Sequence, residues 1–357
     1  MTNQDKNILW LDLFDFLTYG KKIKLLETIE KTENLREKFL HIKEIKEILT
    51  NEEFNKMAIC LSEEYLNRHL RDYEKENVQL ITFNNPNYPY TLKEISTPPL
   101  CLYCKGDVSL LNSLSFAVVG TRKPTDYGIV ITKQYCKDIS KHMTIVSGLA
   151  TGIDAIAHKT ALEQNGRTIA VLAGGFNNIY PAVNYNLAKQ IETTNLLVSE
   201  YPPNTKPLSY YFPIRNRIIA GLSKGVLVPE MGEKSGSMHT INYAIEFNRD
   251  IFVVPGKINS PMSKGSNALI KNLQGCITTS PEDILETYNL TQDKEKPNQQ
   301  LDINSQMIIS FIQSEKKTYQ EILDYTRLPA NELNTILMTL ELEGLIVKLA
   351  NNSYIMA

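Results

Sequence analysis

The sequence lacks the features that mark membrane proteins and secreted proteins. Its 357 residues contain no run of about 18 consecutive apolar residues, so we expect no membrane-spanning helix. Residues 1–10 lack a basic segment followed by an apolar one. We therefore expect no secretory signal and a cytoplasmic protein.

Cysteine is scarce, and its spacing suggests no shared role. The five cysteines are scattered and odd in number, which argues against a disulfide framework. Cys101 and Cys104 form a CxxC motif, but it lies inside an apolar run and no second Cys or His pair follows nearby. The motif predicts a buried strand, and we expect neither a metal nor a cofactor.

Net charge is small, at −2, but it is unevenly distributed. Residues 1–110 and 301–357 each carry −3, whereas residues 111–290 hold 17 basic and 13 acidic residues, a net charge of +4. A basic middle segment favours a polyanionic ligand, although a single nucleotide would also satisfy this charge.

The apolar patterns divide the chain into segments. Residues 1–80 show helical spacing and predict a helical, SAM-like module, and the polar residues 291–302 predict a linker. Residues 303–357 predict three helices and a hairpin, which together make a winged-helix domain. Its third helix, 329–343, has three glutamates and no Lys or Arg, so we expect it to contact protein rather than duplex DNA.

Residues 81–290 alternate between short apolar runs and helical stretches. This alternation predicts an α/β domain with a parallel sheet covered by helices on both faces. The carboxyl ends of parallel strands meet at one edge, where the following helices present free N–H groups, so we expect phosphate to bind there. The predicted strands are 116–119, 144–146, 168–172, 196–199, 225–228 and 251–254.

Turns marked by small or basic residues follow these strands and supply the candidate binding residues. The first turn contains an arginine, whose guanidinium can bind phosphate through two hydrogen bonds. The GxGxxG spacing of a dinucleotide site is absent. The predicted phosphate-binding residues are Gly120, Thr121, Arg122, Ser147, Gly148, Gly174, Gly175, Arg215, Asn216, Arg217, Lys234, Ser235, Gly236 and Lys257.

Two questions within this set stay open. Arginines flank Asn216 at the start of an apolar helix, where positive charge opposes the helix dipole, so an anion is expected between them. One of the two arginines could instead pair with a buried carboxylate such as Glu200 or Glu230. Asp154 and His158 stand four residues apart and could form an acid/base pair, but a purely local polar pair is commoner. We predict no catalytic residue.

A series of ordered motifs connects residues 87–256. They include Val119-Gly120-Thr121-Arg122, Ser147-Gly148-Leu149-Ala150, Ser199-Glu200-Tyr201-Pro202-Pro203, Phe212-Pro213-Ile214-Arg215-Asn216-Arg217 and Val254-Pro255-Gly256. Together they resemble the DNA-processing protein A family, also called DprA or Smf. The resemblance implies a Rossmann-like domain, often with an N-terminal helical domain and a C-terminal winged helix. Departures at Thr151, at residues 229–231 and at residues 238–239 affect the expected basic lining.

The resemblance implies a non-enzymatic, single-stranded DNA-binding recombination mediator. Such a protein protects incoming DNA and helps load RecA onto it during natural transformation, so the implied partners are single-stranded DNA, RecA and a second copy of the chain. Two alternatives remain: a phosphoribohydrolase of the lysine-decarboxylase-like type, whose Pro-Gly-Gly-x-Gly-Thr-x-x-Glu motif is missing here, and a nucleotide sensor. Aromatic residues near the turns could stack on bases; they are Tyr127, Phe176, Tyr180, Tyr210 and Tyr211.

Overall fold

The computed structural model describes residues 2–30, 39–290, 302–313, 315–342, 345–349 and 352–356. The chain forms two compact units, Met1–Leu290 and Thr291–Ala357. The predicted linker lies almost entirely outside the described residues, as do Glu343 and Gly344 of the predicted C-terminal domain. In the described parts of the chain, no helix is long and apolar enough to cross a membrane.

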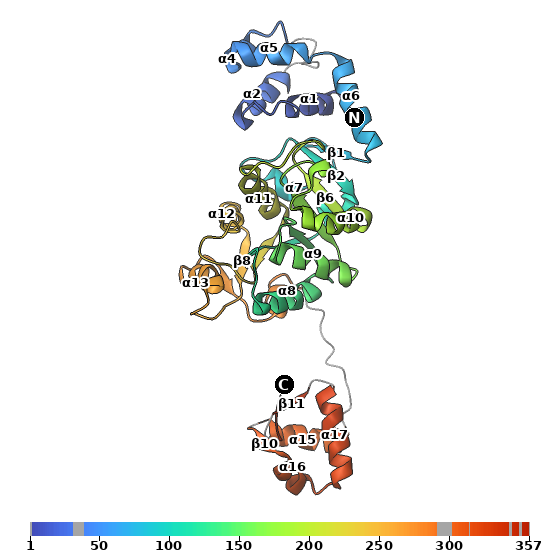
Figure 1. The fold of residues 1–357 in the computed structure, drawn as a ribbon, viewed down its shortest axis with the longest axis vertical. Coiled ribbons are helices and arrows are strands. Elements are labelled where there is room, and N and C mark those ends of the chain that lie inside the picture. Colours follow the sequence, from blue (N-terminus) through green and yellow to red (C-terminus); the bar gives the residue numbers. More distant parts are fainter. Residues whose placement is uncertain are drawn as a thin grey trace. The chain divides into compact units, whose positions relative to one another are not determined.

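Six parallel strands form the centre of the first unit (Figure 1). Their spatial order is β6-β5-β4-β3-β7-β8, and each strand pairs in parallel with its neighbours in this set. All six predicted strands are confirmed to within one residue at each end, because strands buried on both faces need continuous apolar runs. They are β3 (Ser115–Val118), β4 (Thr144–Ser147), β5 (Thr168–Leu172), β6 (Leu196–Ser199), β7 (Gly225–Val228) and β8 (Asp250–Val253).

Three further strands extend this sheet at its edges. Beyond β6, β2 (Cys101–Gly106) and β1 (Gln79–Thr82) run antiparallel, and beyond β8 the short β9 (Cys276–Ile277) is parallel. The CxxC motif lies in β2, as predicted, and its two thiols face opposite sides of the sheet because they are three residues apart. Burial raises the pKa of both thiols.

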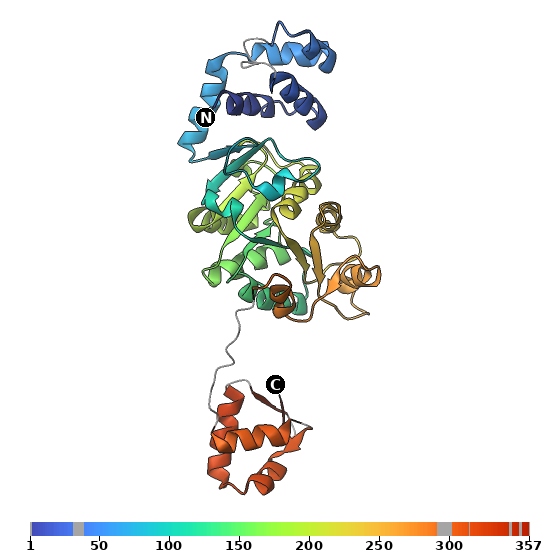
Figure 2. The ribbon, with the colours of Figure 1, turned by 180° about the vertical axis from the view of Figure 1, so that it is seen from behind.

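Helices cover both faces of the sheet (Figures 1 and 2). Neighbouring residues of one strand alternate between the two apolar cores, as the two-residue period of a strand requires. One face packs against α8 (Asp126–Ile139), α9 (Ile153–Glu163), α10 (Tyr185–Thr194) and α14 (Pro281–Thr287). The other packs against α7 (Tyr90–Lys93), α11 (Tyr211–Leu222), α12 (Met238–Glu246) and α13 (Lys264–Lys271). Short 3-10 turns are η1 (Val108–Asn112), η2 (Phe176–Asn178), η3 (Ala182–Asn184) and η4 (Pro261–Ser263).

The N-terminal helices belong to the same compact unit as the sheet. Their apolar residues share a core with β2 and α10, and the Tyr103 hydroxyl of β2 donates a hydrogen bond to the Asp12 carboxylate at 3.1 Å. A domain boundary near residue 80 and the SAM-like assignment stay predictions. The helices are α1 (Asn3–Asp12), α2 (Tyr19–Glu30), α4 (Lys43–Ile48), α5 (Asn51–Ile59) and α6 (Glu63–Lys75).

In its described residues, the second unit contains three helices and a three-stranded sheet. The hairpin predicted at the end of the chain is present, with β11 and β12 antiparallel, and β10 pairs with the other side of β12. The winged-helix assignment and the protein-contact role of its third helix stay predictions. The elements are α15 (Ile303–Ile312), β10 (Lys317–Thr318), α16 (Tyr319–Thr326), α17 (Ala330–Leu342), β11 (Ile346–Lys348) and β12 (Ser353–Met356).

Candidate functional site

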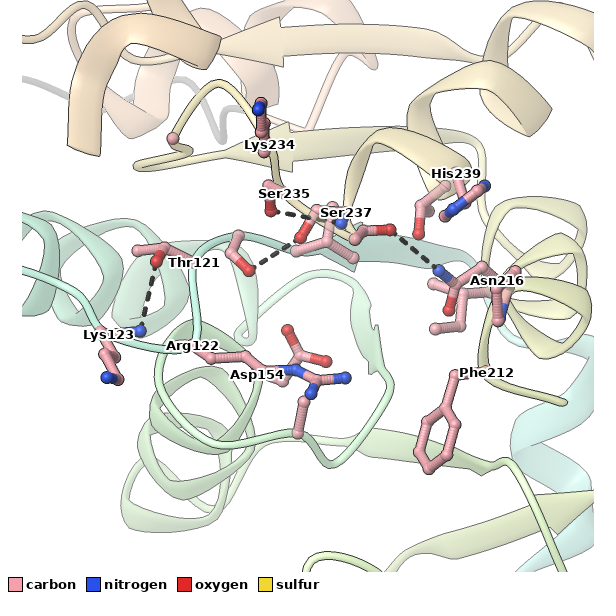
Figure 3. A pocket seen from close by; sticks show the side chains of 18 of the residues that line it. Thr121, Arg122, Lys123, Asp154, Phe212, Asn216, Lys234, Ser235, Ser237 and His239 are labelled. Carbon is pink, nitrogen blue, oxygen red and sulfur yellow. Dashed lines mark hydrogen bonds between the residues drawn. The ribbon is translucent and has the colours of Figure 1, made fainter. Parts of the chain in front are cut away.

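A cleft of about 980 Å³ opens at the carboxyl ends of β3 and β7. These neighbouring strands lead into helices on opposite faces of the sheet, α8 and α12, which is where ligands bind in open α/β folds. Three segments supply most of the lining: 119–123 after β3, 207–216, which includes the first residues of α11, and 232–240 after β7, which includes the first residues of α12. Figure 3 shows their side chains around the cleft.

Eight of the fourteen predicted residues line this cleft, although they come from three distant parts of the sequence. They are Gly120, Thr121, Arg122, Arg215, Asn216, Lys234, Ser235 and Gly236. The other six do not line it: Ser147, Gly148, Gly174, Gly175, Arg217 and Lys257. For the eight lining residues, phosphate binding remains a prediction. For the other six, their position outside the cleft weakens that prediction.

Arg122 combines charge with an aromatic partner in the cleft. Its exposed side chain points into the cleft in Figure 3, and its guanidinium lies 5.9 Å from the centre of the Phe212 ring. The Tyr180 ring meets Phe212 edge-on at 5.5 Å between centroids. Exposed Lys123 and Lys234 add two further cations to the lining. The cleft therefore has both cationic and aromatic surfaces.

Phe212 and Lys123 are missing from the residues predicted to bind phosphate. The sequence carried a signal for each, since Lys123 directly follows Arg122 and Phe212 opens the motif that contains Asn216. Tyr180 was among the predicted stacking residues and lines the cleft, with its side chain 54% exposed. The rings of Phe176 and Tyr211 are engaged elsewhere, the first buried and the second stacked on Tyr201 at 4.0 Å.

The Arg215 side chain occupies the space beside Gly148, where the sequence predicted that phosphate would bind. Its Nη1 donates hydrogen bonds to the backbone carbonyls of Gly148, at 2.8 Å, and Val171. A Cβ at residue 148 would lie 2.5 Å from the Arg215 guanidinium, so a larger residue there would displace the guanidinium. Burial lowers the pKa of Arg215 to about 10, and the nearby charge of Asp154 acts in the opposite direction.

Ser147 and Gly148 are therefore structural, contrary to the prediction. The Ser147 hydroxyl is fully buried and donates to the Val118 carbonyl at 2.7 Å, and the Gly148 N–H donates to Asp154 at 3.1 Å. Both groups are used inside the protein, the hydroxyl by a carbonyl of β3 and the N–H by a carboxylate at the start of α9. Burial raises the pKa of Asp154, against the opposing effect of Arg215.

Arg217 is the structural member of the arginine pair. It is 5% exposed, and its Nη2 donates to Glu200 Oε1, which confirms the alternative that one arginine pairs with a buried carboxylate. Burial by itself would lower the pKa of Arg217, but the charge of Glu200 and its hydrogen bond raise it. A second bond runs from Nε to the Thr97 hydroxyl at 3.3 Å. This arginine is not available to a ligand in the cleft.

The remaining predicted residues lie outside the cleft for different reasons. A Cβ on Gly174 would lie 3.1 Å from the backbone of Pro207, and the Gly175 N–H donates to the Thr205 carbonyl at 2.8 Å, so the two glycines permit close packing of loops. Lys257 is exposed, but its loop is tied to α13 through two hydrogen bonds between Gly256 and Asn267.

The start of α12 forms the wall opposite Arg122. The Ser237 hydroxyl donates to the Gly120 carbonyl at 2.7 Å, which joins the loops after β7 and β3. The Asn216 amide lies 3.5 Å from the Gly236 carbonyl. A Cβ at Gly236 would meet nothing within 4 Å, so this backbone is open to the cleft rather than packed.

Asp154 and His158 do not form the acid/base pair that their spacing allowed. His158 is fully buried, and its Nδ1 lies 2.7 Å from the Thr168 hydroxyl. Because that hydroxyl donates to the Ile145 carbonyl, Nδ1 must be the donor to it, and Nε2 has no partner. Burial lowers the pKa of His158 to about 3. The residue is a neutral core histidine.

The neutral state of His158 predicts a loss of stability in acid. Its folded pKa, about 3, lies below the unfolded value of about 6.5, so the unfolded chain binds more protons between these pH values and stability falls as pH falls. At pH 5.5 we expect a cost of about 1.4 kcal/mol relative to neutral pH.

Urea unfolding of wild type and His158→Gln from pH 7.5 to 5 measures this cost. The difference in stability between the two proteins should shift in favour of the variant as pH falls. Burial raises the pKa of Asp12 to about 6, with the opposite sign, but this group is common to both proteins and cancels. A pH-independent difference would contradict the buried neutral state.

No group of three or more potential metal-ligating side chains occurs in the described residues. Cationic and aromatic side chains around an open cleft instead suit an extended anion that carries flat rings. At this sheet edge, the fold and the cleft define an α/β protein of the nucleotide- and nucleic-acid-binding type.

This chain belongs to the DNA recombination-mediator protein A family, whose sequence model matches residues 79–289. It is 44% identical over 223 residues to the DNA processing protein DprA of Bacillus subtilis, covering 62% of this chain and 75% of that protein. It is 45% identical over 216 residues to the protein Smf of Escherichia coli, covering 60% and 57% of the two chains. The predicted family resemblance is confirmed.

Two solved structures share the fold. DprA of Streptococcus pneumoniae matches with a TM-score of 0.70 and 33% identity, covering 80% of this chain and 98% of that one. DNA processing protein A of Helicobacter pylori, described for its single-stranded DNA binding mode, matches with a TM-score of 0.54 and 33% identity, covering 59% and 96%. The Rossmann-like sheet is thus the family's fold.

Proposed function

We propose that this protein binds single-stranded DNA in the cleft and acts as a non-enzymatic recombination mediator. The observation that carries the proposal is the exposed guanidinium of Arg122 over the Phe212 ring, with Tyr180 beside it. Arginine next to aromatic faces binds single strands, because it offers charge to phosphates and stacking surfaces to bases. The single-stranded DNA binding described for the Helicobacter pylori relative supports the same ligand.

The charged and the aromatic side chains of the cleft bind different parts of a DNA strand. Arg122, Lys123 and Lys234 are exposed cations that can contact successive phosphates. Phe212 and Tyr180 offer ring surfaces that only unstacked bases can reach, so a duplex would leave them unused. The ligand is therefore single-stranded DNA rather than duplex DNA.

The acidic and imidazole groups near the cleft have structural partners, which favours binding over catalysis. Asp154 lines the cleft, but its carboxylate accepts from the Gly148 backbone and lies beside the Arg215 guanidinium. His158, on α9, is fully buried. An acid or base must reach the atom that it protonates or deprotonates. We therefore propose no reaction at this site.

The biological role extends this binding. A recombination mediator that holds single strands would protect incoming DNA and help to load RecA during natural transformation. We propose RecA and a second copy of this chain as its protein partners. Family membership supports this role.

Binding should depend on salt with a slope set by the free cations. The three exposed cations of the cleft, Arg122, Lys123 and Lys234, predict a slope of log K against log salt of roughly −2 per protomer, since single strands release about 0.7 counterion per phosphate contact. Fluorescence anisotropy with labelled oligothymidylates of increasing length, from 50 to 300 mM salt, measures it. Affinity should rise with length until the cleft is filled.

A control series uses duplex DNA of the same lengths and a single nucleotide. Duplex affinity should be weaker at every salt concentration. Affinity that is independent of length, with a slope near −1, would overturn the proposal and favour a nucleotide sensor, and turnover of a nucleoside monophosphate would favour the phosphoribohydrolase alternative.

A further inference from the structure

One residue of a neighbouring loop, Glu230, holds both ends of the segment that carries Arg122. Glu230 follows β7 and is 2% exposed. Its backbone carbonyl accepts a hydrogen bond from the Thr121 N–H at 2.9 Å. Its carboxylate accepts two bonds from Thr125, at 2.8 Å from the backbone N–H and 2.7 Å from the hydroxyl. Segment 121–125 is therefore bracketed by a single residue.

The Glu230 carboxylate also occupies the N-terminus of α8. Thr125 is the N-cap of this helix, and its hydroxyl accepts from the Gly128 N–H at 3.3 Å while it donates to Glu230. A Cβ at Gly128 would collide with the carboxylate. A negative charge is favourable at a helix start, where backbone N–H groups and the helix dipole meet. The sequence suggested that phosphate would bind here, but the protein's own carboxylate takes that place.

The opposite side of the segment is fixed by the loop before α9. The Ile153 N–H donates to the Thr121 carbonyl at 3.2 Å. Gly152 adopts a φ of 79°, which favours glycine, and a Cβ there would lie 2.7 Å from the carbonyl carbon of Arg122. Because the backbone is held from both sides, the Arg122 side chain starts from a defined position, from which it extends into the cleft.

We propose that Glu230 is a positioning residue for single-stranded DNA binding. It contacts no DNA itself; it fixes the backbone of segment 121–125, so that the Arg122 and Lys123 side chains are directed to the phosphates. This inference rests on the proposed function. Glu230 thus promotes the binding of an anion through the backbone that it fixes, although its negative charge alone would oppose such binding.

The test compares Glu230→Ala with a matched acidic control. Glu233 lies in the same loop and lines the cleft, but its side chain is exposed. We expect Glu230→Ala to weaken oligothymidylate binding about 10-fold, and Glu233→Ala to tighten it, because a charge in the cleft that repels phosphate is removed. Glu230→Gln keeps an acceptor for the Thr125 N–H and should stay within about 3-fold of wild type.

A double-mutant cycle separates positioning from a purely structural role. In an Arg122→Ala/Lys123→Ala background, at low salt, the effect of Glu230→Ala should shrink below about 2-fold, since there are no side chains left to position. An equal loss in both backgrounds would overturn the proposal, as would unchanged affinity in a folded Glu230→Ala protein.

Two further comparisons keep the result interpretable. If Glu230→Ala does not fold, Thr125→Val removes one bond to the same carboxylate and enters the same cycle, with the same outcomes for and against. Failure of wild type to bind single strands would defeat the proposed function. Normal wild-type binding without coupling between Glu230 and Arg122 would defeat only this inference.

Discussion

Replacement of Arg122 by alanine should weaken single-stranded DNA binding about 10- to 100-fold and leave stability nearly unchanged. The side chain is exposed and lies over Phe212, so truncation leaves no buried cavity. A charge-assisted hydrogen bond is worth about 1.5–3 kcal/mol, which corresponds to this range of affinity. Anisotropy at constant salt measures the loss, and thermal unfolding measures stability.

A matched control is available in Arg68. It is an exposed arginine on α6 with no part in the cleft, so Arg68→Ala removes the same charge from the same unit. Its affinity should remain within about 2-fold of wild type. Equal losses in both variants would mean that net charge, rather than the cleft, governs binding, and no loss in either would remove Arg122 from the site.

Replacement of Arg217 by methionine should have the opposite pattern, with a large loss of stability. Removal of one partner from a buried ion pair costs about 3–5 kcal/mol, because the other charge is left unpaired. We expect about 3 kcal/mol here, since the Glu200 side chain remains 17% exposed. In thermal unfolding this corresponds to a midpoint about 6–12 °C lower.

The double variant Arg217→Met/Glu200→Met separates the ion pair from simple packing. It removes both charges and should recover most of the lost stability, since apolar replacement of a whole buried pair is often close to neutral. Folded Arg217→Met protein should retain its DNA affinity. A variant that is as stable as wild type but binds DNA poorly would place Arg217 in the binding site instead.

The sequence could predict the sheet but not the use of its edge. Six apolar runs located β3 to β8, because strands buried on both faces leave few alternative assignments. It did not reveal that β1 and β2 add antiparallel strands beyond β6, since a buried apolar run carries no information on strand direction.

Part of the site could also be predicted, because some of its residues directly follow a predicted strand. Gly120 and Arg122 follow a strand directly, so their place at the sheet edge came from local sequence alone. The loss of Gly148 as a phosphate ligand could not be foreseen, because the guanidinium that fills its space belongs to Arg215, on a helix much later in the chain. Long-range contacts decide which turns remain open.

The two arginines illustrate this limit. Both lie near the start of α11, and nothing in the local sequence distinguishes the role of one from that of the other. Their roles separate only because one turns toward the Gly148 and Val171 carbonyls and the other toward Glu200. Arg217 is engaged by Glu200, so an anion between the two arginines is not supported, whereas phosphate binding by Arg215, which lines the cleft, stays a prediction.

Three consecutive residues of α11 tie this helix to three separate loops. Arg215 reaches the loop after β4, Asn216 the loop after β7, and Arg217 the loop after β6. The wall of the cleft is therefore ordered as part of folding, and its conformational entropy is already lost before any ligand arrives. Association with a flexible strand then incurs no entropy cost for ordering the backbone of this wall, which is the thermodynamic advantage of a preorganised surface for a disordered ligand.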